Sequence, residues 1–141
     1  MKQKKKLLLL LSIVTVTDMD TGKNKVIWLT KFNPVNSDTE VSEARIVKIT
    51  NTRFAILYTT TTNNVSTLNY VLVKDNGKVL IRKTYNDITF TAATQPIIYN
   101  GYIVWTDVYT KQEQAVNEWG YPYTSHNDYN VLCKIPVLLD K

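Results

Sequence analysis

The sequence predicts an all-β fold of antiparallel strands, and three observations support this prediction. Thr, Val and Tyr are abundant among the 141 residues, and β-branched and aromatic side chains fit the pleated, half-buried face of a sheet. Short apolar runs are separated by turn signals, such as the Asn-Gly pairs within residues 75–77 and 100–101. Residues 25–32 and 78–85 are nearly alike and lie 53 positions apart, which indicates a repeated structural unit.

Nine strands are expected, and the connections between them alternate in length. A continuous apolar run, as at residues 54–58, suits a strand that is buried on both faces. The strands are expected at residues 7–17, 25–32, 45–50, 54–62, 68–75, 78–85, 96–99, 102–110 and 129–138. The longer connections are expected at residues 33–44, 63–67, 86–95 and 111–128, and tight turns join the other strands.

This alternation groups the strands into units of four. Residues 45–85 supply one full four-stranded unit. Residues 7–32 supply the third and fourth strands of a unit before it, and residues 96–138 supply the first three strands of a unit after it. We therefore expect residues 1–141 to form a single module, with its long connections on one side and its tight turns on the other.

Two motifs carry a resemblance to a known family. Residues 18–23 read Asp-Met-Asp-Thr-Gly-Lys, and Trp28 follows in the next expected strand. Pro96, two apolar residues and the Asn-Gly turn at 100–101 precede a strand that carries Trp105. This pattern resembles the repeat of β-propeller proteins of the quinoprotein-like (PQQ-repeat) and WD40-like class. The resemblance implies antiparallel four-stranded blades in a partial propeller, which further blades or other copies of the chain would complete because a ring has about 4–8 blades.

The first residues allow more than one interpretation. Lysines at positions 2 and 4–6 precede an apolar run at 7–14, which is the outline of a secretory signal peptide. The run is shorter than the ~20 apolar residues that a membrane-spanning helix needs, so no membrane span is expected. No small-x-small cleavage site follows it, and residues 14–18 precede their turn as 71–75 precede theirs, which favours a strand. A signal peptide and a membrane-surface anchor stay as alternatives; the location is expected to be extracellular or at the cell surface, with a cytoplasmic one left open.

Composition argues against several classes of function. Four lysines near the N-terminus supply four units of the net charge of +5, so no basic face for a nucleic-acid partner is expected. Cys133 is the only cysteine and His126 the only histidine, which excludes an internal disulfide and a multi-histidine metal site. Residues 18–24 share alternating oxygen ligands with a calcium loop but lack its closing Glu, so no metal is expected. We expect no cofactor, and no catalytic residues, because Ser125, His126 and Asp128 are mere neighbours in sequence.

The longest expected loop, at residues 111–128, and the first residue after it carry the candidate binding residues. Aromatic rings with a polar edge recur at binding surfaces because they give contact area at a small cost in entropy. The alternative is that these rings pack the loop onto its own sheet. The residues expected to contact a ligand or partner are Trp119, Tyr121, Tyr123, His126 and Tyr129.

These observations favour a non-enzymatic β-propeller module that binds a protein or glycan partner through its long-loop face. One alternative is a structural subunit that polymerises or completes a ring through exposed blade edges. Another is a non-catalytic fragment of a larger propeller enzyme. The partners expected are therefore a protein or a glycan, together with self-association or additional blades.

Overall fold

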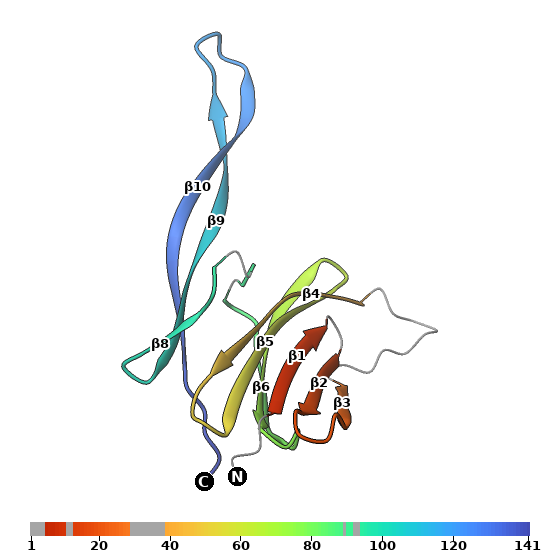
Figure 1. The fold of residues 1–141 in the computed structure, drawn as a ribbon. Helices are drawn as coiled ribbons and strands as arrows, with labels where there is room; N and C mark the ends of the chain where they lie inside the picture. Colours follow the sequence, from red (N-terminus) through yellow and green to blue (C-terminus); the bar gives the residue numbers. More distant parts are fainter. Residues whose placement is uncertain (1–4, 11–12, 29–38, 89, 92–93) are drawn as a thin grey trace.

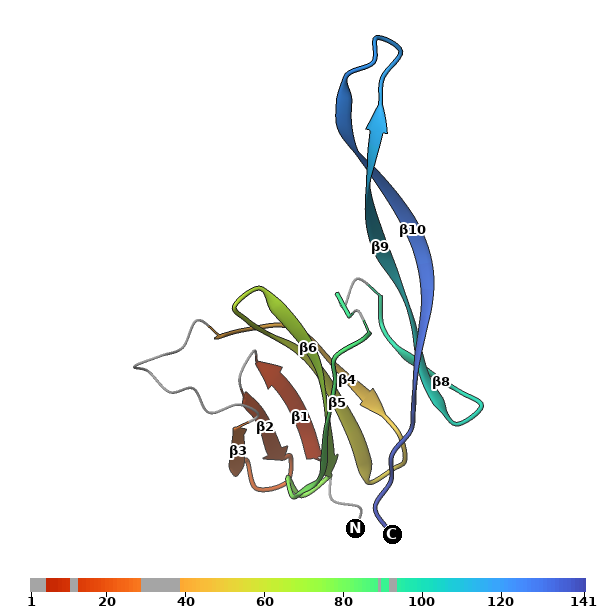
Figure 2. The same cartoon turned by 180° about the vertical axis from the view of Figure 1, so that it is seen from behind.

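The computed structural model describes residues 5–10, 13–28, 39–88, 90–91 and 94–141, with side chains from residue 15 onward. Within them the chain is all-β and antiparallel, as predicted, with ten strands in three sheets and no helix. The three sheets lie face to face, with a four-stranded sheet between two three-stranded ones (Figures 1 and 2). The end of the strand predicted at 25–32 and residues 33–38 of the connection predicted at 33–44 lie outside the described residues. The rest of that predicted connection is wrong, because residues 39–44 begin a strand.

The central sheet contains the four strands predicted between residues 45 and 85, in sequential order. Its strands β5 and β6 are covered on both faces, and Ala55, Ile56 and Leu57 are fully buried as neighbours in sequence. Three consecutive buried residues show that successive side chains meet a packed layer on each side of the sheet. The strands are β4 (Thr39–Lys48), β5 (Arg53–Thr62), β6 (Val65–Lys74) and β7 (Val79–Tyr85).

The connection predicted at residues 63–67 is wrong, because β5 and β6 pair to their ends and leave a two-residue turn. Thr62 is paired with Val65, and the turn residues Asn63 and Asn64 have φ values of 51° and 62°. Positive φ at both central residues matches the twist of the two strands, and Asn tolerates this conformation without Gly. The turn was not predicted because it contains no Gly, the residue most typical of such turns.

The first sheet covers one face of the central sheet. The single strand predicted at 7–17 is wrong, because the chain forms two antiparallel strands there, with residues 11–12 outside the described part. Val16 and Ile27 of this sheet form a buried cluster with Ile56, Tyr58 and other residues of β5 and β6. The strands are β1 (Lys5–Leu10), β2 (Ile13–Asp18) and β3 (Asn24–Trp28).

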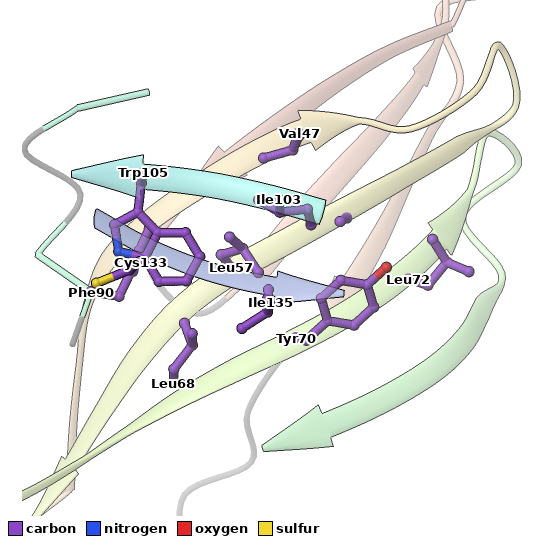
Figure 3. Close-up of a cluster of buried hydrophobic side chains, with 11 residues drawn as sticks. Val47, Leu57, Leu68, Tyr70, Leu72, Phe90, Ile103, Trp105, Cys133 and Ile135 are labelled. Carbon is purple, nitrogen blue, oxygen red and sulfur yellow. The ribbon is translucent and has the colours of Figure 1, made fainter. Parts of the chain in front are cut away.

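The third sheet covers the opposite face of the central sheet. Side chains of its two long strands point toward β5 and β6 in the larger buried cluster, which Figure 3 shows. Within that cluster Phe90 and Trp105 meet edge to face, with ring centroids 5.5 Å apart. The strands are β8 (Ile97–Tyr99), β9 (Tyr102–Val116) and β10 (Pro122–Pro136).

The long loop predicted at residues 111–128 is wrong, because these residues continue β9 and begin β10. The two strands stay in one register from the pair Tyr102 and Pro136 to the pair Val116 and Pro122. Their far half, residues 108–130, projects away from the three sheets and is called the hairpin arm below (Figures 1 and 2). The described residues cover neither face of the arm, and its sequence lacks the apolar alternation by which a half-buried strand is recognised.

Candidate functional site

The hairpin arm begins where β9 loses its cover, and a buried carboxylate marks that point. Asp107 is only 4% exposed, and its carboxylate accepts hydrogen bonds from the hydroxyl of Thr91 (2.8 Å) and the backbone N–H of Thr91 (3.2 Å). It also accepts a bond from the backbone N–H of Val108 at 2.8 Å. A buried carboxylate is costly unless its oxygens are satisfied in this way. Asp107 therefore fixes the base of the arm to the segment that follows β7.

Strand register assigns the arm residues to two faces, because residues paired across two strands point to the same side. One face carries the pairs Tyr109 with Tyr129 and Ala115 with Tyr123. His126 is paired with Gln112 and lies on the opposite face. The arm is held together by exposed polar contacts, among them Lys111 with Glu113 at 2.6 Å, Thr110 with Asp128 at 2.6 Å and Gln114 with Thr124 at 3.2 Å.

The tip of the arm is an ordered turn that holds two aromatic side chains in solvent. The side-chain oxygen of Asn117 accepts hydrogen bonds from the backbone N–H groups of Trp119 (3.0 Å) and Tyr121 (2.9 Å). Gly120 supplies a φ of 83°, a conformation that a side chain would strain. Trp119 is 74% exposed and Tyr121 is 68% exposed. The turn therefore presents both rings without packing either one.

The five predicted contact residues all lie on the arm, but they do not form one cluster. Trp119, Tyr121 and Tyr123 gather at the tip and the strand pair next to it. Tyr129 is six residues further along β10, or about 20 Å at the usual rise of a strand. His126 is exposed on the other face. The alternative that these rings pack the loop onto its own sheet does not hold for Trp119 and Tyr121, which are 74% and 68% exposed, whereas Tyr123 and Tyr129 are half-exposed on the ribbon itself.

Two sets of exposed residues were missed by the sequence analysis. Tyr109 shares a face with Tyr129, and only the strand register reveals this pairing. The outer face of the third sheet carries Ile97 (60% exposed), Tyr99 (64%) and Leu132 (72%). The alternating pattern of residues 102–106 and 131–135 is the signal for this face, since one set of side chains is buried and the other is not.

The carboxylate of Asp18 stabilises the turn between β2 and β3. Asp18 accepts hydrogen bonds from the backbone N–H groups of Asp20 (3.0 Å) and Thr21 (3.2 Å). In the described residues, no group of three or more His, Cys, Asp and Glu side chains is placed to hold a metal ion. The described part of the chain also contains no apolar helix of the length that a membrane crossing requires.

Comparison with known proteins identifies no relative of this chain. No family model, no curated protein and no solved structure matches it.

Proposed function

We propose that this chain is a non-enzymatic interaction module that grips a partner with its hairpin arm. The observation that carries the proposal is the arm itself, a two-stranded ribbon with aromatic side chains at its tip, whose faces and outer edges are left open by the described residues. An isolated two-stranded ribbon is marginally stable in water. A partner that covers the arm would remove this instability and bury the exposed rings.

A protein partner suits the arm better than a glycan does. Along the arm, no other described strand pairs with the outer edge of β9 or of β10. A polypeptide strand can extend such an edge through the backbone N–H and C=O groups. Trp119 and Tyr121 add large, flat contact surfaces of the kind that dominate protein interfaces. A glycan would use the rings but leave the backbone edges unpaired.

Site-specific photocrosslinking tests this proposal in cells that make the chain. A benzophenone amino acid at Tyr121 or Tyr123 is expected to yield discrete adducts with a protein. The same amino acid at Thr21, which is exposed in the turn between β2 and β3, is the matched control. Equal adducts at all three positions, or none at any of them, would contradict the proposal, and replacing Trp119 and Tyr121 by Ala should remove the adduct formed at Tyr123.

A second candidate function is assembly into a larger stack of sheets, and the outer face of the third sheet favours it. End layers of stacked repeats need a polar outer face, whereas Ile97, Tyr99 and Leu132 expose large apolar side chains on this one. We infer that the three sheets are blades of a propeller that further blades or other copies complete. Light scattering after size exclusion tests it: Leu132→Lys should dissociate assemblies that Val116→Lys, on the arm, leaves intact. A wild-type chain that stays a 16.2 kDa monomer at every concentration would contradict assembly from copies.

A further inference from the structure

A groove lies on the face of the central sheet that the third sheet covers only in part. Near the turn between β8 and β9, the buried side chains of β9 and β10 cover this face. Toward the turn between β5 and β6 the hairpin arm diverges from the sheet (Figures 1 and 2). The uncovered part forms a groove of about 300 Å³, which none of the arm residues lines. It is therefore a feature separate from the arm.

The floor of the groove is apolar and held in place. It is formed by Leu68, which is 1% exposed, by Phe90, which is 5% exposed, and by the half-buried Ile88. The hydroxyl of Thr59 donates a hydrogen bond to the backbone oxygen of Phe90 at 2.9 Å. The Phe90 ring also meets Trp105 edge to face. An apolar guest would therefore meet a surface that needs no rearrangement.

The walls of the groove carry hydroxyl groups where the core ends. Along β5 the residues on this face change from Ala55 and Leu57 to Thr59 and Thr61. Ser66 of β6 lies opposite Thr61, and their hydroxyls are hydrogen-bonded at 3.0 Å. A hydroxyl oxygen that takes part in one hydrogen bond keeps the capacity to accept another. The walls therefore offer acceptors above an apolar floor.

The groove is also lined by two carboxylates, Glu43 and Asp87, and by no lysine or arginine among the described residues. This acidic lining belongs to a chain whose net charge is +5. Glu43 lies in a β-bulge between the pairs Ser42 with Thr59 and Arg45 with Leu57, and its φ is 56°. A residue other than Gly in this conformation stores strain, and a bulge redirects a side chain from its regular face.

We propose that this groove receives the side chain of a lysine or arginine from a protein partner. Such a side chain has an apolar stem, which fits the floor, and a cationic head that only donates hydrogen bonds. Hydroxyl oxygens and the carboxylates of Glu43 and Asp87 supply the acceptors and the opposite charge. A neutral sugar would gain nothing from that charge. The inference goes one step beyond the proposed function, since it assumes that the partner is a protein and states the chemistry of one anchor.

Three short peptides test the proposal by two-dimensional amide NMR of the full chain. Acetyl-Gly-Lys-Gly-amide and its Arg analogue are expected to shift the amide signals of Ser42, Thr61 and Asn86, which line the groove. The analogue with norleucine keeps the stem and lacks the charge. It should bind at least about threefold more weakly, because it loses ion pairing with the exposed carboxylates of Glu43 and Asp87. Salt should weaken the charged peptides alone.

Variants separate this site from the arm. Glu43→Gln and Asp87→Asn should each reduce Lys peptide affinity about three- to tenfold, whereas Glu113→Gln on the arm should leave it unchanged. Trp119→Ala with Tyr121→Ala should also leave it unchanged, so failure of the arm proposal and failure of this one are distinguishable. Equal shifts with the norleucine peptide, or no groove shifts with the Lys and Arg peptides at millimolar concentration, would overturn the proposal. Binding of only one of the two cations would identify which side chain the groove takes.

Discussion

The two halves of the β9–β10 ribbon share one register and differ in what covers them. In the half that packs on the central sheet, Ile103, Trp105 and Ile135 are at most 3% exposed. In the hairpin arm, residues at equivalent positions of the same ribbon, such as Tyr109 and Tyr129, are 50% exposed. Hydrogen bonding between strands therefore does not show how much a segment contributes to the stability of the fold. The packed half stabilises the fold, and the arm is available for contact.

The largest difference is expected between two tryptophans of this ribbon. Trp105→Ala should lower the free energy of unfolding by about 3–5 kcal/mol, because it removes a buried ring and its contact with Phe90. Trp119→Ala should lower it by less than about 0.5 kcal/mol, because the ring is 74% exposed. Urea unfolding followed by circular dichroism measures both. Equal losses would mean that the arm is part of the cooperative core.

A smaller difference is expected between two aspartates. Asp107→Ala removes the acceptor for Thr91 and for the backbone N–H of Val108, which should cost about 1–3 kcal/mol. Asp128→Ala on the arm removes one exposed bond from Thr110 and should cost less than about 0.5 kcal/mol. Urea midpoints at constant m-value give the comparison. A cost at Asp128 that matches the cost at Asp107 would contradict the separation of base and arm.

The sequence alone predicted the structural features that depend on local patterns of residues. Apolar runs such as 54–58 and the Gly-containing turns identified antiparallel strands, and the unit at 45–85 is one sheet of four strands. The resemblance to propeller repeats stays a prediction, because three open sheets do not test ring closure. Whether a segment forms a strand depends on neighbouring residues in the sequence, whereas closure of a propeller ring depends on what covers the outer faces of the sheets.

Residues 111–128 of the arm were predicted as a loop because neither face of the ribbon is buried there. Residues 111–128 contain polar side chains in consecutive positions, and the period-2 signal arises only where one face is covered. The candidate aromatic residues were identified from composition alone. Their division between two faces required the register, which places His126 opposite Gln112 and away from Tyr123. The groove between β4, β5, β6 and residues 86–88 and 90–91 left no sequence signal, because it arises from the divergence of two sheets.

The hydroxyl of Tyr70 bonds to the segment that follows β10. Tyr70 is buried, and its hydroxyl donates to the backbone oxygen of Leu138 at 2.7 Å and accepts from the Leu138 N–H at 3.3 Å. Tyr70→Phe should lower the free energy of unfolding by about 1 kcal/mol at neutral pH, since both bonds are lost. The melting temperature measures this loss, and no change would mean that the segment after β10 does not anchor the base.

The same residue makes stability fall at high pH. Burial raises the pKa of Tyr70 from 10.0 to about 12. Its contribution is fully present below pH 10, where the unfolded chain also keeps the proton, and it is lost as pH rises through about 12. The melting temperature of the wild type should therefore fall more steeply than that of Tyr70→Phe between pH 10 and 12. Parallel curves would contradict the assignment, and the difference between the two curves removes the contribution of the other tyrosines.

The smallest expected effect is confined to the tip of the arm. Asn117→Ala removes the acceptor for the backbone N–H groups of Trp119 and Tyr121, so the exchange of these two amides should accelerate about three- to tenfold. The free energy of global unfolding should change by less than about 0.5 kcal/mol, because no buried side chain loses a contact. Asn127→Ala, which alters only an exposed side-chain bond to Ser125, is the control. If only amides of the arm, on the tip side of Asp107, exchange faster, the arm opens independently of the body, as expected of a segment that a partner orders. If the amide of Ile103 also exchanges faster, the arm and its base unfold as one cooperative unit, which would contradict this expectation.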